Sequence, residues 1–238
     1  MKICSASSTG KVRAVNEDSF FVSDATAADT VLAVVADGMG GHNAGEVASA
    51  EVVNVLKNSD FSENADTKKA LLDAIEYANN TVYKMSTRSP ELHGMGTTVT
   101  ACVIAGNKVT AAQVGDSRLY LMRDGKITQI TTDHSLVGML LERGSITKED
   151  AKNHPQKNVI TRAIGTDNSV EADIYEFSAK PNDILLLCSD GLVNMVEDER
   201  ILSLITNTEN FDDLAHILVG EAENAGGLDN ITVVLIKF

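Results

Sequence analysis

Four apolar stretches of this sequence each meet an aspartate at one end. The dipeptides at these junctions are Asp37-Gly38, Gly115-Asp116, Asp190-Gly191 and Asp229-Asn230. A strand that ends in a carboxylate and a turn places an acid at the rim of a sheet. Several such rims facing one cleft would gather the oxygen ligands that hard divalent cations prefer. The pattern therefore predicts a site for more than one metal ion.

A single Asp-Gly pair is weak support, because the same dipeptide favours tight hairpin turns. We interpret Asp124-Gly125 as such a turn, since it joins two clear strands at hairpin spacing. Asp37-Gly38 and Asp190-Gly191 differ, because a glycine run or a helix follows them and leaves no hairpin to close. Taken singly, Asp116 and Asp229 are better explained by a turn or a helix cap. Only the joint pattern favours metal binding.

The kinds of ligand atom in the motifs indicate which metal would bind. Oxygen donors without a matched histidine or cysteine pattern favour magnesium or manganese over zinc or copper. The five histidines lack metalloprotease spacing, and we expect most of them at the surface or in a flap; they are His42, His93, His134, His154 and His216.

A second group of polar residues, Arg13-x-x-Asn16-Glu17-Asp18, lies just ahead of the first expected strand. The planar fork of an arginine can hold two phosphate oxygens at once. The alternative is a surface ion pair between this arginine and the neighbouring acids. Next to several metal-binding aspartates, a phosphate clamp is the better interpretation.

Composition excludes several classes of function. The 238 residues include 34 acidic and 20 basic side chains, and a net charge of −14 does not suit binding to a nucleic-acid backbone. Three widely spaced cysteines argue against a disulfide framework or a zinc knuckle. No apolar run reaches the roughly 20 residues of a membrane span, and no signal-peptide pattern begins the chain. We expect a single domain over residues 1–238, cytoplasmic, without membrane insertion.

Hydrophobic periodicity predicts strands grouped apart from paired helices. Expected strands are 19–23, 30–36, a meander over 97–104, 108–114, 118–122 and 126–130, then 170–177, 183–188 and 231–238; expected helices are 43–57, a segment between Asp66 and Pro90, 198–205 and 212–223. The weakly regular segment 133–166 is interpreted as a surface flap. This order indicates an α+β fold with antiparallel sheets between helix pairs.

The ordered motifs of the whole chain resemble those of the metal-dependent type 2C (PPM family) serine/threonine protein phosphatases, in their compact bacterial form. The matching segments are Arg13-x-x-Asn16-Glu17-Asp18, Ala36-Asp37-Gly38-Met39-Gly40-Gly41-His42, Gly96-Thr97-Thr98, Val114-Gly115-Asp116-Ser117-Arg118, Ser189-Asp190-Gly191 and Asp229-Asn230-Ile231-Thr232. The resemblance implies a central sandwich of two antiparallel sheets flanked by helix pairs, a four-layer αββα fold with a flap over the active site.

The resemblance also implies a role for each acid. Asp37 would bridge two Mn²⁺ or Mg²⁺ ions, the Gly38 carbonyl would bind the second, and Asp190 with Asp229 would complete the first. Asp116 would join Asp190 in a weaker third site. Two further acids, Asp18 and Glu17, would hold metal-bound waters, and Arg13 would hold the substrate phosphate.

The implied reaction is direct in-line attack on phosphorus by a hydroxide bridging the two cations. No cysteine has an arginine six residues downstream, so the signature of cysteine phosphatases is absent from the sequence. Animal relatives carry a histidine, proposed as the general acid, where this chain has Met39. His42 or a metal-bound water would then supply the proton to the leaving serine or threonine.

The expected substrates are phosphoserine and phosphothreonine in proteins. By resemblance, a membrane-anchored serine/threonine kinase would be the opposing partner, and a monomer is the family default. Two alternatives stay open at this point: a phosphoprotein-binding regulatory module with weak catalysis on the same fold, and a hydrolase of small phosphate esters.

Overall fold

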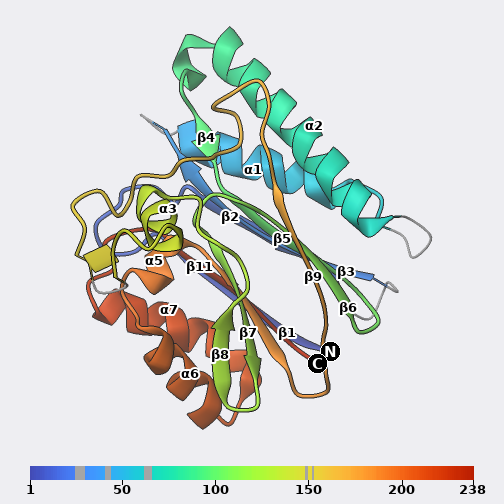
Figure 1. Cartoon of the computed structure of the whole chain (residues 1–238), viewed down its shortest axis with the longest axis vertical. Helices are drawn as coiled ribbons and strands as arrows, with labels where there is room; N and C mark the ends of the chain where they lie inside the picture. The colour runs from blue at the N-terminus through green and yellow to red at the C-terminus, as the bar shows by residue number, and fades with distance from the viewer. Residues whose placement is uncertain (25–29, 41–43, 62–65, 148–149, 152) are drawn as a thin grey trace.

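The structure is a computed structural model that describes residues 1–24, 30–40, 44–61, 66–147, 150–151 and 153–238. Its strands form two antiparallel sheets (Figure 1). The first sheet has the order β1 (Lys2–Ser8), β11 (Ile231–Lys237), β10 (Ile184–Cys188), β7 (Arg118–Arg123) and β8 (Lys126–Gln129). The second has the order β2 (Asp18–Val22), β3 (Thr30–Met39), β5 (Val99–Ala105), β6 (Lys108–Val114) and β9 (Asp173–Ser178), with β4 (Gly96–Thr97) paired to the end of β3.

Helices cover the outer face of each sheet. The second sheet packs against α1 (Ala44–Lys57) and α2 (Thr67–Arg88), and the first against α6 (Asp198–Asn207) and α7 (Leu214–Asn224). In Figure 1 these two helix pairs lie on opposite sides of the strands. Short helical segments complete the described elements: α3 (Leu136–Glu142), α5 (Asp190–Val193), and 3₁₀ turns at Pro90–Leu92 and Phe211–Asp213. The expected αββα sandwich is confirmed.

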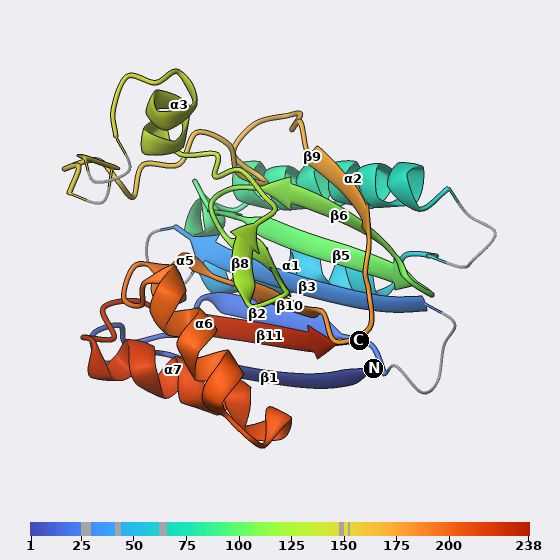
Figure 2. The same cartoon turned by 60° about the horizontal axis from the view of Figure 1, so that its bottom comes forward.

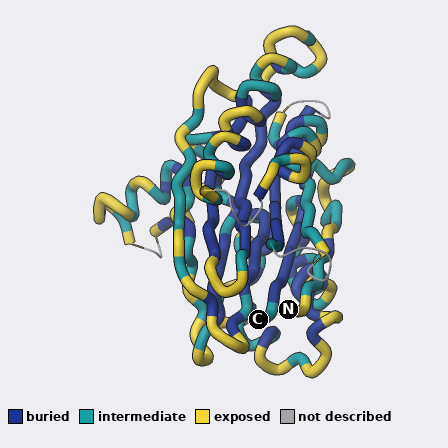
Figure 3. Tube along the Cα trace, turned by 90° about the vertical axis from the view of Figure 1, so that its right-hand side faces the viewer, coloured by how far each residue is buried: buried dark blue, intermediate teal, exposed yellow. Residues whose placement is uncertain are grey.

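Strand β3 shows why its sequence is apolar without alternation. Leu32 and Val34 pack toward α1 and α2, whereas Val31, Ala33 and Val35 face the other sheet. A strand buried on both faces reads as a continuous apolar run. Figure 3 shows the buried strands together at the centre of the molecule.

The helix signals of the sequence are confirmed where they can be checked. The Asp66 side chain caps α2 by accepting a hydrogen bond from the Lys69 amide at 3.1 Å, and α2 ends at Arg88, before Pro90. The start proposed near Asn43 for α1 lies outside the described residues, and the described helix begins at Ala44. No helix in the described ranges has the length and apolar character needed to cross a membrane.

The expected four-stranded meander is wrong. Strands β5 and β6 pair in one sheet and β7 and β8 in the other, so the turn around Gly115 carries the chain from sheet to sheet. Local periodicity identifies a strand, but the choice of its partner depends on long-range packing. Strand β1, which pairs with β11 along its whole length, was also not predicted.

The segment predicted as a flap contains α3 and leaves the layers, as Figure 2 shows. Within this segment Ser135 forms an isolated β-bridge with Ile160. Near the end of the segment Ile164 forms a second bridge, with Thr97 of β4. Because Thr97 itself pairs with Gly38, the returning end of the segment is fixed beside the aspartate of β3.

Candidate metal centre

Carboxylates from both sheets meet at one end of the sandwich. Asp18 begins β2 directly opposite Asp37, near the end of β3. From the other sheet, Asp190 follows β10 and Asp229 precedes β11. The Ser189 hydroxyl joins the two sheets here, because it donates to Asp18 Oδ2 at 2.7 Å and accepts from the Thr232 amide at 2.9 Å.

Two carboxylate oxygens at this junction are buried and have no hydrogen-bond partner among the described residues. They are Oδ1 of Asp18 and Oδ1 of Asp190. The other oxygen of Asp190 accepts a hydrogen bond from Asn194 at 2.9 Å. An unpartnered buried carboxylate oxygen is costly, and binding to a cation is one way to remove that cost.

Burial and mutual repulsion raise the pKa of these acids. Burial raises the pKa of Asp37 well above its ordinary value, and the charges of Asp18, Asp190, Asp116 and Asp229 raise it further. The pKa of Asp18 is raised to about 7 by burial, despite hydrogen bonds from Thr232 and Ser189.

The two other acids behave alike. Burial, followed by the charge of Asp190, raises the pKa of Asp116 to about 8. Burial, followed by the charge of Asp229, also raises the pKa of Asp190. Carboxylates gathered in this way favour protons or cations as counter-charge.

No group of three or more acidic, histidine or cysteine side chains in the described part of the chain is already arranged to hold a metal ion. The fit to divalent cations therefore rests on the unpartnered oxygens and the raised pKa values, together with a donor set made of oxygen alone. That set suits manganese or magnesium.

Close backbone contacts explain the glycines of the two Asp-Gly pairs in this centre. A Cβ on Gly38 would lie 2.2 Å from the Gly45 carbonyl oxygen and 2.5 Å from that of Glu17. A Cβ on Gly191 would lie 2.0 Å from the Asn230 carbonyl oxygen. Glycine is therefore needed for the chain segments to approach each other, and with them the carboxylates.

The Gly96-Thr97-Thr98 motif, for which sequence reasoning predicted no role, holds the backbone of Asp37 in place. Thr98 Oγ1 accepts from the Asp37 amide at 3.0 Å, and the Thr97 hydroxyl donates to the Asp37 carbonyl at 2.8 Å. Thr98 Oγ1 also lies 2.7 Å from Ser117 Oγ, next to Asp116. A buried hydrogen-bond network thus links the aspartates of β3 and of the β6–β7 turn.

Asn230 is a further positioning residue that sequence reasoning missed. Its side-chain nitrogen donates to the carbonyls of Thr9 and Val15 at 3.0 and 2.9 Å, and its oxygen accepts from the Glu17 amide at 2.8 Å. Asn230 is buried. It holds the loop that carries Arg13 against the Asp229 turn. Its signal in the sequence was its place in the motif Asp229-Asn230-Ile231-Thr232, in which no role was assigned to Asn230.

Arg13 and Glu17 both lie at the predicted centre. The Arg13 guanidinium donates to Asp229 Oδ2 at 2.9 Å, and both side chains are partly exposed, at 50% and 33%. The Glu17 carboxylate lies against the start of α1, where a Cβ on Gly45 would meet its Oε1 at 2.6 Å. Burial raises the pKa of Glu17, which a hydrogen bond from the Gly45 backbone opposes.

His42 lies outside the described residues, so its predicted role as a proton donor stays a prediction. A different histidine is buried near the centre. His134 Nδ1 accepts from the Gly115 amide at 3.2 Å, and its Nε2 lies 3.2 Å from Asp173. Burial lowers the pKa of His134. His134 lies in the segment predicted as a flap, and it connects that segment to the turn that carries Asp116.

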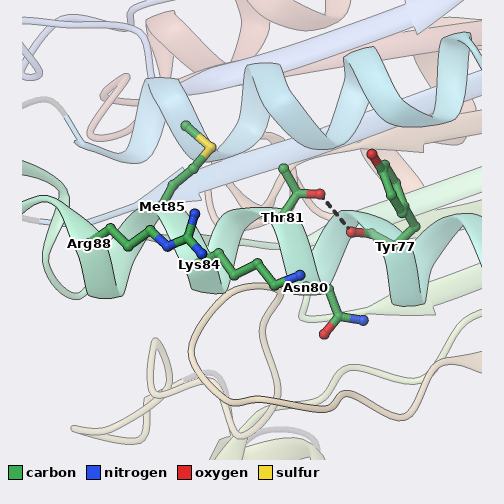
Figure 4. A pocket seen from close by; sticks show the side chains of 6 residues that line it. All are labelled: Tyr77, Asn80, Thr81, Lys84, Met85 and Arg88. Carbon is green, nitrogen blue, oxygen red and sulfur yellow. Dashed lines mark hydrogen bonds between the residues drawn. The ribbon is translucent and has the colours of Figure 1, made fainter.

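A hollow of about 530 Å³ lies along the outer face of α2, as Figure 4 shows. Its lining consists of Tyr77, Asn80, Thr81, Lys84, Met85 and Arg88. None of the predicted site residues lines it. The carboxylate chemistry is therefore at the end of the sandwich and not in this hollow.

Comparison with known proteins identifies related phosphatases. The family model described as protein phosphatase 2C matches residues 7–225. The chain is 39% identical to a serine/threonine phosphatase, stp, of Listeria monocytogenes, over 96% of this chain and 92% of the relative. It is 43% identical to the serine/threonine protein phosphatase PstP of Mycobacterium tuberculosis, over 99% of this chain and 44% of that longer relative.

Solved structures give the same result. A crystal structure of the M. tuberculosis phosphatase superposes with a TM-score of 0.92 at 40% identity, covering 100% of this chain and 98% of the other. A structure of the PstP catalytic domain with two manganese ions superposes with a TM-score of 0.88 at 40% identity, covering 98% and 96%. The chain therefore belongs to the protein phosphatase 2C family, and it is a metal-dependent serine/threonine protein phosphatase.

Proposed function

We propose that Asp37, Asp190, Asp229 and the Gly38 carbonyl hold two divalent cations, Mn²⁺ or Mg²⁺, within one catalytic domain spanning the chain. Asp116 would share a third, weaker cation with Asp190. The observation that carries the proposal is the meeting of acids from two sheets, with an unpartnered buried oxygen on Asp18 and on Asp190. The manganese ions of the related PstP structure support the choice of metal.

The remaining two acids would act through water. Asp18 flanks the centre from the start of β2 and Glu17 from the preceding loop, where their carboxylates can orient waters. When bound, the cations supply a water activated for attack at neutral pH and neutralise charge on the phosphoryl oxygens. The role of the protein residues is to hold the acids and the substrate in a fixed geometry.

Arg13 would bind the substrate phosphate through its guanidinium. For this it must leave Asp229, to which it donates a hydrogen bond at 2.9 Å. A partly exposed ion pair of this kind contributes about 0 to 1 kcal/mol, whereas paired hydrogen bonds from arginine to phosphate are stronger. The exchange of partner is therefore energetically favourable when a phosphate arrives.

The leaving serine or threonine oxygen needs a proton. His42 is one proposed donor, and a water held at the centre is the other. A pH profile of kcat separates them. A general acid acts only in its protonated form, so loss of the alkaline limb in His42→Gln would support the histidine, whereas an unchanged profile would assign the proton to water.

The biological setting is proposed from family resemblance. Phosphoproteins modified by a membrane-anchored serine/threonine kinase are the expected substrates, and the protein would act on them from the cytoplasm as a monomer. A comparison of phosphoproteomes from cells with and without the protein would identify its targets. Phosphorylation sites that rise when the protein is removed are the candidates.

The test of the metal assignment measures hydrolysis of a phosphothreonine peptide in Mn²⁺, Mg²⁺ or excess chelator. We expect turnover only with added cation, and loss of turnover in Asp37→Ala and Asp190→Ala. Titration calorimetry with Mn²⁺ should show fewer bound ions for Asp190→Ala than for the matched control Asp124→Ala. Full turnover in chelator would refute the proposal, and binding of phosphopeptide without turnover would favour a regulatory module.

The third site has its own test. Asp116→Ala should remove a weak Mn²⁺-binding event and leave the tight ones in place. If calorimetry shows the same number of weak ions in wild type and in Asp116→Ala, Asp116 is not a ligand. Activity toward metabolite phosphates that exceeds activity toward phosphoproteins would instead indicate a hydrolase of small esters.

A further inference from the structure

Two large apolar side chains remain exposed beside the phosphate-binding arginine. Val12 is 64% exposed and precedes Arg13, and Leu228 is 57% exposed and precedes Asp229. Over the described residues, only six large apolar side chains stay exposed, and these two belong to segments that contact each other. Exposed apolar side chains on adjoining segments beside a functional site indicate a contact surface.

Hydrogen bonds join the segment that carries Val12 to the segment that carries Leu228. The Lys11 amide donates to the Gly227 carbonyl at 2.8 Å, and the Arg13 guanidinium donates to Asp229 at 2.9 Å. Val12 and Leu228 lie between these two hydrogen bonds in their respective segments. Each of the two exposed side chains therefore adjoins a residue of the Arg13–Asp229 pair, and we refer to these two side chains as the Val12/Leu228 patch.

Backbone contacts hold the loop segment in place. Gly10 has a φ of +74°, and a Cβ there would lie 2.2 Å from the Asp229 carbonyl oxygen. The carbonyls of Thr9 and Val15, on either side of Val12, both accept hydrogen bonds from Asn230.

The opposite segment is fixed too. The Gly227 amide donates to the Ala222 carbonyl at 3.0 Å, and this hydrogen bond holds the residue before Leu228 against the end of α7. A patch whose backbone is already ordered loses little conformational entropy when a ligand covers it.

We propose that the Val12/Leu228 patch binds an apolar side chain flanking the phosphoserine or phosphothreonine of a protein substrate. The inference rests on the proposed role of Arg13 as the phosphate clamp. Residues of an extended peptide are about 3.4 Å apart, so a side chain one or two positions from the phosphorylated residue lies close to Arg13 when its phosphate is bound. Substrate specificity would then include an apolar flanking residue.

The test compares matched phosphothreonine peptides that carry leucine or serine one and two positions before, or after, the phosphorylated residue. We expect kcat/KM of the wild-type protein with Mn²⁺ to be about tenfold higher for leucine on at least one side. In the double variant Val12→Ser/Leu228→Ser, this preference should fall to about twofold or less. Equal kcat/KM values for leucine and serine peptides on both sides would overturn the proposal.

Control variants separate the patch from general effects. Tyr77→Ser removes another exposed apolar side chain, on α2 and 65% exposed, and should keep the wild-type preference. The conservative pair Val12→Ile/Leu228→Met should also keep it, because apolar area is retained. A loss of preference in Tyr77→Ser, or a full preference in the double serine variant, would contradict the assignment.

A small substrate separates this proposal from the catalytic one. Each kcat/KM value is divided by that for p-nitrophenyl phosphate, which has no flanking residues. Absence of wild-type activity toward both substrates would refute the proposed catalytic function. Activity without any preference for apolar flanks would refute only the docking surface. A change from dimer to monomer in the double serine variant, with peptide preference intact, would make the patch a self-association surface and would also overturn the proposal.

Discussion

The Asp-Gly dipeptide at residues 124–125 and those at the metal centre are identical in sequence and differ in physical role. In the hairpin, Asp124 and Gly125 have φ values of 52° and 70°, and a Cβ on Gly125 would meet nothing within 4 Å. At the centre, Gly38 and Gly191 lack such φ values, and a Cβ would lie within 2.2 Å of a carbonyl oxygen. The first glycine provides a turn conformation, and the others allow close approach of two chain segments.

The aspartates differ in the same way. Asp124 is exposed at the hairpin, whereas burial raises the pKa of Asp37 well above its ordinary value. Desolvation and the neighbouring carboxylates make the buried acid a candidate for a cation, and an exposed acid has no such need. The dipeptide alone therefore does not determine function, and the surrounding strands do.

The largest expected difference is in activity. Asp37→Asn should lower kcat/KM for a phosphopeptide with saturating Mn²⁺ by more than about 100-fold, beyond what outer-shell substitutions at metal sites cost. Asp124→Asn should stay within about twofold, because the change is at an exposed turn. The measurement is steady-state hydrolysis by the two purified variants. Similar losses of kcat/KM in Asp37→Asn and Asp124→Asn would contradict the distinction between the metal-centre aspartate and the hairpin aspartate.

The glycines should differ in stability. Gly191→Ala should lower the free energy of unfolding by about 2 to 3 kcal/mol, because its Cβ would lie 2.0 Å from the Asn230 carbonyl oxygen. Gly125→Ala should cost about 1 kcal/mol through its φ alone, and Gly125→Asn less. Urea unfolding gives both values. An equal cost for the two alanine variants would remove the distinction between close approach and turn conformation.

The pH dependence should reveal the buried acids. The pKa of Asp18 is raised to about 7 and that of Asp116 to about 8, so the folded chain holds protons that the unfolded chain releases near pH 4. In chelator, this stability is present below about pH 4 and is lost as the pH rises toward 8. Urea unfolding from pH 4 to 8 measures the change.

Two comparisons sharpen this pH prediction. Asp18→Asn should flatten the decline, whereas Asp124→Asn should leave it as in wild type. Added Mn²⁺ should increase stability most above about pH 7, because cations bind the deprotonated carboxylates. A pH profile of Asp18→Asn that matches wild type would argue against a buried, proton-holding Asp18.

The smallest effect should come from Asp124→Ala. Its φ of 52° favours aspartate or asparagine over alanine, so we expect a loss of about 0.5 kcal/mol in unfolding free energy and no change in kcat/KM. Asp124→Asn should retain wild-type stability. A marked loss of activity in Asp124→Ala would give the hairpin a functional role that its position does not predict.

The sequence alone was sufficient for the fold class, the family and the reaction type. Apolar periods marked most strands and helices, and the ordered motifs marked Asp37, Asp190 and Asp229 because each lies where a strand begins or ends. These signals are local, since they depend on residues that follow one another along the chain.

The tertiary structure decided what depends on distant residues. The passage of the chain from one sheet to the other at Gly115 was not predicted, because strand partners are chosen by packing across the molecule. The hydrogen bonds of Asn230 to Thr9 and Val15 and the pairing of Lys11 with Gly227 have the same origin. So do the raised pKa values, which need the burial and mutual repulsion of acids far apart in sequence.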